Sequence, residues 1–158
     1  MKAIFGLALA VMVALGGVAQ AQSAGEKGAA PRPDRERLIG AWHLVSLGEA
    51  GPDGKMQSTA GLKGALIYTR DGHMSVQIMY PVSDSGLSND YVLNGDEASF
   101  GSYDLDARKH TVTHHVQGSI THGLVGKSLT RAYQFSDGHL IIKPVSAQEH
   151  WRVVWEHD

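Results

Sequence analysis

Three of the nine histidines lie in one short stretch, HTVTHHVQGS at residues 110–119. Polar and apolar residues alternate along it as in a β-strand, whose successive side chains point to opposite faces. His114 shares a face with Val112 and Val116, so we expect it to point into the protein interior. His115 is then expected at the surface. An inward imidazole is either a neutral core group, hydrogen-bonded to a tyrosine hydroxyl or the backbone, or a group that contacts a ligand or transfers a proton.

Arg131 is a second residue that could act on a ligand. Alternation along residues 127–135 places it on the inward face, and a buried guanidinium must be paired or stacked. One interpretation is such a structural pairing or stacking contact. The alternatives are recognition of a carboxylate or another anionic group of a ligand, and a slipped register in which Arg131 faces solvent.

The alternation of the other β-rich segments brings further aromatic side chains to the interior. Tyr68 and Tyr103 are the phenols best suited to form an acid/base pair with His114, so these three residues are the candidates for catalysis. A mostly apolar wall with a few convergent polar groups is typical of a ligand pocket. The residues expected to bind ligand are Arg131, Tyr133, Trp42, Tyr68, Tyr103, His114, Trp151 and Trp155.

The nine histidines do not predict a metal site. Zinc needs three or four ligands that converge on one point, whereas neighbours on a strand diverge. His110 and His114 share a face, yet the four residues of strand between them correspond to roughly 13 Å. The sequence also has no cysteine, no glycine-rich phosphate loop and no Gly-x-Ser-x-Gly motif. We therefore expect no metal, no cofactor and no disulfide.

Eight β-rich segments would position these side chains, and turns such as Asp71-Gly72 join several of them into hairpins. Closing sequential antiparallel strands into an up-and-down barrel removes both exposed sheet edges. We therefore expect an all-β, eight-stranded antiparallel barrel, with a two-sheet sandwich as the alternative. The polar connection at 82–99, with a helical turn near Glu97, would form a lid. The expected strands are residues 38–47, 63–69, 73–80, 100–105, 110–119, 127–135, 139–145 and 148–157.

The first 21 residues have the pattern of a secretion signal. Met1-Lys2 precede a short apolar run, and Ala19-Gln20-Ala21 fits a signal-peptidase site. Cleavage after Ala21 would leave a flexible leader at 22–37 and one folded domain at 38–158. It would also change the net charge from −2 to −3, because the segment holds one lysine and no acid. This charge disfavours a nucleic-acid partner. We expect a periplasmic or secreted protein with no integral membrane segment after cleavage.

Four stretches together resemble the bacterial lipocalin-like domain family. They are LIGAWHL at 38–44, with the Gly-x-Trp of a first lipocalin strand, LIYTRDGHMSVQIM at 66–79, TVTHHVQGS at 111–119 and VVWEH at 153–157. The similarity covers nearly all of residues 38–157, and it implies a calycin-type barrel with an internal cavity. It also implies that an arginine from a late strand, Arg131 or Arg152, covers Trp42 through a cation–π contact. Unlike animal lipocalins, the chain has no disulfide and no predicted C-terminal helix. Asn89-Asp90-Tyr91 resembles a second lipocalin motif, but it lies in the long loop before the expected fourth strand, so we attribute this similarity to chance.

The resemblance and the expected pocket lead to three functional hypotheses. The first is an exported lipocalin-like protein that holds a small hydrophobic or amphipathic ligand, with Arg131 or tyrosine hydroxyls fixing its polar end. The second is a cofactor-independent isomerase, cyclase or lyase in which His114 transfers a proton. The third is a structural or interaction protein of the cell envelope, which predicts a filled barrel. A shared fold alone does not choose among them.

Overall fold

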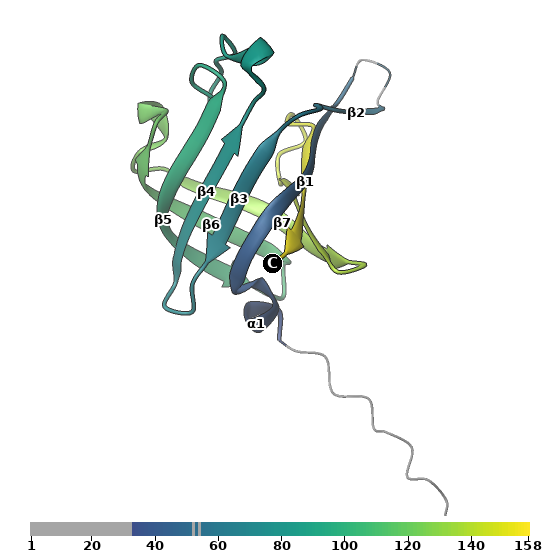
Figure 1. Ribbon diagram of the computed structural model, residues 1–158. Coiled ribbons are helices and arrows are strands. Elements are labelled where there is room, and N and C mark those ends of the chain that lie inside the picture. The colour runs from purple at the N-terminus through teal and green to yellow at the C-terminus, as the bar shows by residue number, and fades with distance from the viewer. Residues whose placement is uncertain (1–32, 52, 54) are drawn as a thin grey trace, which may run out of the picture. The chain divides into compact units, whose positions relative to one another are not determined.

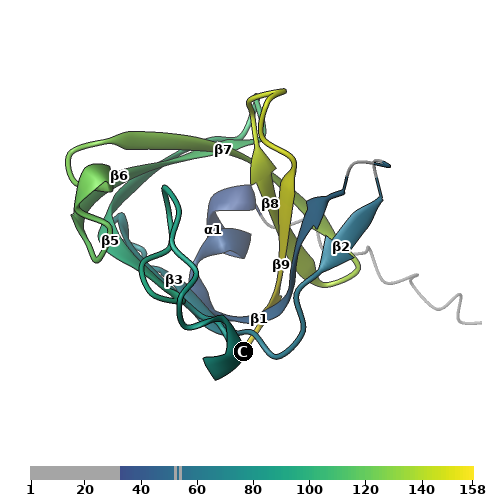
Figure 2. The same ribbon diagram turned by 90° about the horizontal axis from the view of Figure 1, so that it is seen from above.

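The computed structural model describes residues 33–51, 53 and 55–158. The predicted signal segment and residues 22–32 of the predicted leader lie outside this part of the chain. Within it, nine antiparallel strands follow one another around a sheet that β1 and β9 close by pairing with each other. Figures 1 and 2 show the resulting barrel from the side and from above. The strands are β1 Gly40–Ala50, β2 Met56–Ser58, β3 Lys63–Tyr68, β4 His73–Met79, β5 Asp96–Asp106, β6 Thr111–Ser119, β7 Ser128–Ser136, β8 His139–Pro144 and β9 Trp151–His157.

The predicted eight-stranded up-and-down barrel is confirmed, with β2 as a short addition. The first half of β1 pairs with β3, and its last three residues, 48–50, pair with β2 along the same edge. β2 and β3 thus share one position around the barrel, which keeps the number of positions at eight. None of the described helices is long and apolar enough to cross a membrane.

Several boundaries differ from the sequence prediction, and two of these differences concern whole elements or the site. β5 begins at Asp96 and pairs with β4 from Met79 onward, so Glu97 lies in a strand and the predicted helical turn there is wrong. The connection before it is correspondingly shorter and begins with a 3-10 turn, η1 Val82–Asp84. Regular structure also starts four residues before Leu38, in the helix α1 Asp34–Leu38. The end of the predicted flexible leader is therefore helical.

An irregularity in β1 changes which side chains face inward. Simple alternation from Trp42 would place Leu47 on the outside of the barrel. The register between β1 and β9 shifts between Leu44 and Ser46. A bulge of this kind adds one residue and reverses the alternation that follows. As a result Leu47 is buried and Glu49 also lines the interior.

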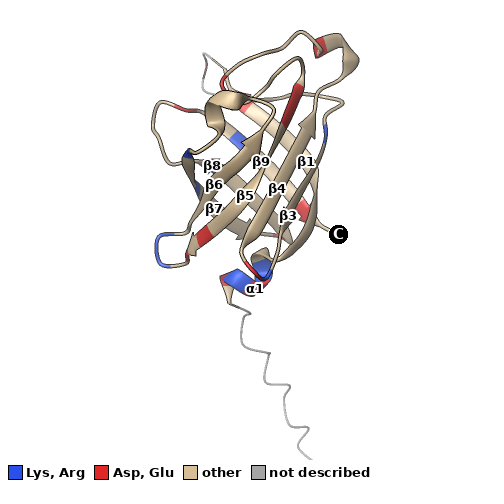
Figure 3. Ribbon diagram, turned by 90° about the vertical axis from the view of Figure 1, so that its left-hand side faces the viewer, with Lys and Arg blue, Asp and Glu red and all other residues tan. Residues whose placement is uncertain are grey.

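Helix α1 lies across one end of the barrel, as the view from above shows (Figure 2). It carries the charged residues Asp34, Arg35, Glu36 and Arg37, seen as blue and red in Figure 3, of which Arg35 and Glu36 are exposed and Asp34 and Arg37 are half-buried. Leu38 is completely buried, and its carbonyl oxygen accepts a hydrogen bond of 2.9 Å from Nε1 of Trp42. Apolar burial and this bond close the end of the barrel.

The arginine that packs at this closed end is neither Arg131 nor Arg152, the two that we expected to cover Trp42. The Trp42 ring packs edge-on against His157, with 4.7 Å between ring centroids, and tilted against Phe135 at 6.3 Å. The guanidinium over this cluster comes from Arg37, whose Cζ lies 4.0 Å from the centroid of Phe135. Arg131 is buried elsewhere and Arg152 is exposed. The prediction that either one covers Trp42 is therefore wrong.

Candidate functional site

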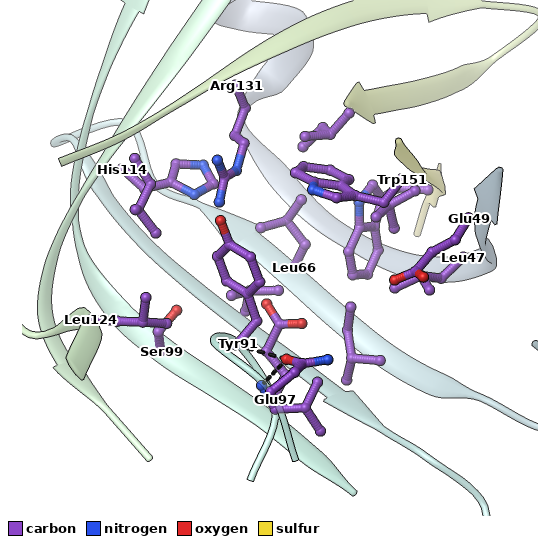
Figure 4. A pocket seen from close by; sticks show the side chains of 18 of the residues that line it. Leu47, Glu49, Leu66, Tyr91, Glu97, Ser99, His114, Leu124, Arg131 and Trp151 are labelled. Atoms are coloured by element: carbon purple, nitrogen blue, oxygen red, sulfur yellow. Dashed lines mark hydrogen bonds between the residues drawn. The ribbon is translucent and has the colours of Figure 1, made fainter. Parts of the chain in front are cut away.

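A cavity of about 110 Å³ lies in the barrel beyond the α1 end (Figure 4). Most of its wall is apolar, with side chains from all the strands except β2 and from the connection between β4 and β5. The side chains of the barrel therefore do not fill its interior completely. The lining residues are Leu47, Glu49, Leu66, Val76, Ile78, Tyr80, Asn89, Tyr91, Val92, Glu97, Ser99, His114, Leu124, Leu129, Arg131, Ile142, Trp151, Val153 and Trp155.

Arg131 brings a positive charge into this mostly apolar space from β7. Its side chain is only 9% exposed. Its Cζ lies 5.2 Å from the centroid of the Tyr91 ring and 4.9 Å from that of Trp151. Both distances allow cation–π attraction, which is stronger where water is excluded. No carboxylate among the described residues forms an ion pair with Arg131, so its N–H groups remain available to a ligand.

A lid holds the two rings around Arg131. Residues 85–95, which follow η1, bring Tyr91 over the barrel mouth. The side-chain oxygen of Asn89 accepts hydrogen bonds from the backbone N–H groups of Tyr91 and Val92, at 2.8 and 2.9 Å. Glu149 then joins the lid to β9, because one of its oxygens accepts bonds from the Tyr91 hydroxyl at 3.3 Å and from Nε1 of Trp151 at 2.8 Å. Part of the predicted lid therefore contributes to the cavity.

His114 lies beside Arg131 and makes a hydrogen bond with Tyr68, with 2.6 Å between Nε2 and the phenol oxygen. Burial raises the pKa of Tyr68 far above its ordinary value, so the phenol keeps its proton. Burial, together with Arg131 and His115, lowers the pKa of His114 to about 3. The imidazole is therefore neutral at pH 7. The Tyr68 hydroxyl has no other partner among the described residues, so it donates to Nε2 and leaves the His114 proton on Nδ1.

Glu97, the second residue of β5, supplies a carboxyl group to the same cavity. Burial raises its pKa to about 7, although Arg131 acts in the opposite direction. Near neutral pH this group is thus divided between its acidic and its ionised form. Ser99, two residues along the same strand, adds a hydroxyl to the lining.

Half of the eight predicted ligand-binding residues line the cavity. Arg131, His114, Trp151 and Trp155 do so. Tyr68 lies behind His114 and reaches the cavity only through it. The other three residues have structural partners elsewhere, which are Leu38 for Trp42, Asp34 of α1 for the Tyr133 hydroxyl at 2.8 Å, and the carbonyl of Thr69 for the Tyr103 hydroxyl at 2.8 Å.

The candidate catalytic residues are brought together only in part. Of the two phenols expected to pair with His114, Tyr68 forms the hydrogen bond. Tyr103 packs edge-on against the Tyr68 ring at 4.8 Å, but its hydroxyl points away to the backbone. Tyr91, Glu97 and Glu149 were not predicted at all. The resemblance of Asn89-Asp90-Tyr91 to a second lipocalin motif is the sequence signal that could have indicated Tyr91.

The second histidine of the pair lies on the outside of β6, as predicted. Nε2 of His115 is 2.9 Å from a carboxylate oxygen of Asp104, and its Nδ1 is 2.8 Å from the hydroxyl of Ser128. These bonds span β5, β6 and β7 across the outer surface. Residues 33–51, 53 and 55–158 contain no cluster of three or more histidine, aspartate or glutamate side chains that could hold a metal ion.

Comparison with known proteins places the chain in a family. The sequence profile of the lipocalin-like domain matches residues 39–156. Among solved structures, the fluorescent protein UnaG is similar at 14% identity and a TM-score of 0.40, over 78% of this chain and 98% of UnaG. Two UnaG mutants give the same TM-score at 11% and 12% identity, over 77% and 78% of this chain and 96% and 97% of theirs. No curated protein matches the sequence. Because the profile match spans the whole barrel from β1 to β9, the chain belongs to the lipocalin-like domain family.

Proposed function

We propose that the protein binds a small, largely apolar molecule in its barrel, with the polar end of that molecule held by Arg131. The observation that carries this proposal is a buried guanidinium that lies against two aromatic rings, those of Tyr91 and Trp151, and has no carboxylate partner among the described residues. A buried cation without a counter-ion is costly, and an anionic or strongly polar ligand group would compensate it. The surrounding apolar wall would bury the rest of the ligand.

The proposal also includes export, which the predicted signal segment supports. Cleavage after Ala21 would deliver the barrel to the periplasm or the extracellular space. N-terminal sequencing of the protein recovered from the cells that normally produce it tests this part. A mature chain that begins at Gln22 is the expected result, whereas intact Met1 on the bulk of the protein contradicts export.

Native mass spectrometry tests the binding function directly. Protein purified from its own cells should show a second species, heavier by the mass of a small molecule, and organic extraction should release that molecule for identification. Its return should change the fluorescence of Trp151 and Trp155, which line the cavity, and not that of Trp42 at the closed end. The variants Trp151→Phe, Trp155→Phe and Trp42→Phe separate the three signals. Absence of any released molecule, together with no fluorescence change across a panel of small acids and neutral compounds, would rule the function out.

A second candidate function is cofactor-independent proton transfer, favoured by the 2.6 Å bond between Tyr68 and His114 beside the cavity. The bond supplies the predicted acid/base pair. The lowered pKa of His114, about 3, makes its imidazole a weak base at neutral pH, so we place this candidate second. Turnover of an identified ligand by the protein, lost in His114→Gln, would favour it. Turnover unchanged in that variant would exclude the role of His114.

A further inference from the structure

Two groups of opposite formal charge share the cavity, and neither is paired. Arg131 and Glu97 both line it, and their side chains form no hydrogen bond or ion pair with another described residue. In the described part of the chain, every side-chain nitrogen or oxygen that is completely shut off from solvent has a hydrogen-bond partner. The unpaired polar atoms of Arg131 and Glu97 must therefore face the open space of the cavity.

The other ionisable groups around Glu97 do not supply charge to the interior. His114 is neutral, and the Tyr80 phenol keeps its proton because burial raises its pKa. Glu49 is exposed, so water screens its charge. Glu149 lies at the mouth and is occupied by two donors. The ionisable groups that line the cavity together with Glu97 are Tyr80 after β4, His114 on β6, Arg131 on β7, Tyr91 of the lid and Glu49 on β1, and Glu149 lies behind Tyr91 and Trp151.

The charge balance of the cavity selects among ligands. With Glu97 ionised, the fixed charges of Arg131 and Glu97 cancel, and an added carboxylate would bring a net negative charge into a low-dielectric space. With Glu97 protonated, Arg131 alone remains charged, and one carboxylate neutralises it. A cationic ligand would be repelled by the positive charge of Arg131. A monoanion accompanied by a proton is therefore the charged ligand that leaves the cavity neutral.

The space limits the size of the ligand. The cavity measures about 110 Å³. A protein cavity of about 150 Å³ suffices for benzene, which has six non-hydrogen atoms, so this smaller and partly open cavity suits a ligand of about four to six. A carboxyl group at Arg131 uses three of them and leaves room for a short apolar tail.

We propose that the cavity binds a short monocarboxylate together with one proton, with the carboxylate paired to Arg131 and the proton held by Glu97. This inference rests on the proposed binding function and specifies its ligand class. The neutral His114 presents its Nδ1–H near Arg131, and the protonated Glu97 becomes a donor as well. Hydrogen bonds from Arg131, His114 and Glu97 thus replace those that the carboxylate makes with water before it enters the cavity.

Calorimetric titration of the full chain with butyrate tests the proposal. Measurements between pH 6 and 8.5, in HEPES and in Tris, report the number of protons taken up, because the two buffers differ in their heat of ionisation. Uptake should be near zero at pH 6, where Glu97 already carries its proton, and approach one proton at pH 8.5. The apparent Kd should rise about tenfold per pH unit at the alkaline end. Butyramide, which has as many non-hydrogen atoms as butyrate, and butylammonium, which has one fewer, should bind at least tenfold more weakly at pH 6.

Two variants assign the effect to residues. Glu97→Gln should take up no proton and should bind butyrate with an affinity independent of pH. Arg131→Met should lose butyrate binding at every pH. Circular dichroism checks that both fold, and Arg152→Met, which removes an exposed arginine, is the matched control. Proton uptake by the unaltered chain remains a test of the proposal if a variant fails to fold.

The outcomes that overturn the proposal differ from those that overturn the binding function. No binding of butyrate at any pH, binding at pH 8.5 without proton uptake, or equal binding of butyramide would each refute proton-coupled carboxylate binding. Release of a neutral or larger molecule from the native protein would do the same and would leave the binding function intact. Only the absence of any bound or binding molecule refutes both.

Discussion

The Tyr68 hydroxyl donates a hydrogen bond of 2.6 Å to Nε2 of His114, and the pair lies between the apolar core and Arg131. Tyr68 is itself only 1% exposed and packs against Tyr103. The bond fixes the orientation of the imidazole and the nitrogen that carries its proton. It also explains how an inward histidine can be both a core residue and part of the cavity wall, which the sequence presented as alternatives.

Replacing His114 should change how stability depends on pH. The unfolded imidazole binds a proton below about pH 6.5, whereas the folded one resists protonation down to about pH 3. Between these values the unfolded state holds more protons, so the stability of the wild-type protein falls as the pH decreases. Urea unfolding of His114→Gln should lack this contribution, which amounts to about 3 kcal/mol at most between pH 6.5 and 4. His115→Gln, which alters the surface neighbour, should keep it. Equal acid sensitivity of the two variants would contradict a buried, neutral His114.

Glu97 should act on stability in the opposite direction. Its pKa is about 7 in the folded protein and about 4.5 in an unfolded chain, so between these values the folded state holds more protons. Stability from this group is therefore present at low pH and is lost as the pH rises toward 7. Glu97→Gln should be more stable than the wild type at pH 8, by on the order of 1 to 3 kcal/mol. Urea unfolding at pH 5 and pH 8 checks this, and a variant less stable than the wild type at pH 8 would contradict it.

The barrel itself was predictable because its signals are local. Polar and apolar alternation identifies the inward face of a strand from a few residues, as for His114 and Val116, and Asp-Gly turns identify hairpins. Helix α1 lacks such a signal, since its sequence DRERL is charged except for one leucine. What holds this helix is the burial of Leu38 and the bond from Trp42, and both depend on the closed barrel.

The missed parts of the site depend on contacts between distant segments. Leu47 and Glu49 face inward only because β1 contains an irregularity where it pairs with β9. Tyr91 is held in the site by its hydrogen bond to Glu149, which lies 58 residues further along the chain. Glu97 appeared to belong to a polar loop, because acidic residues are uncommon in strand interiors. The local sequence does not contain these relationships.

Removing the Arg131 charge should raise the pKa of both of its ionisable neighbours. The guanidinium lowers the pKa of Glu97 and of His114 through its positive charge. In Arg131→Met, NMR titrations should give higher pKa values for both groups. The pKa of Glu97, followed by carbon NMR, should lie above its wild-type value of about 7, and that of His114, followed by nitrogen NMR, above about 3. Arg152→Met should change neither value, because that arginine is exposed. Unchanged values in Arg131→Met would show that the charge is too distant or too well screened to act on this cavity.

The bonds to Glu149 should determine how often the lid opens. Tyr91→Phe removes the 3.3 Å bond from the lid to Glu149 while keeping the ring against Arg131, and Glu149→Ala removes the bond to Trp151 as well. Each lost bond is expected to cost about 1 kcal/mol, which corresponds to about fivefold faster local opening. Hydrogen exchange at the Val92 amide, which bonds to Asn89 within the lid, measures that opening. Exchange should accelerate in Tyr91→Phe and further in Glu149→Ala, with amides of β6 unaffected. Tyr80→Phe is the control, because the Tyr80 hydroxyl has no hydrogen-bond partner among the described residues. Exchange in the two lid variants no faster than in this control would mean that Glu149 does not hold the lid.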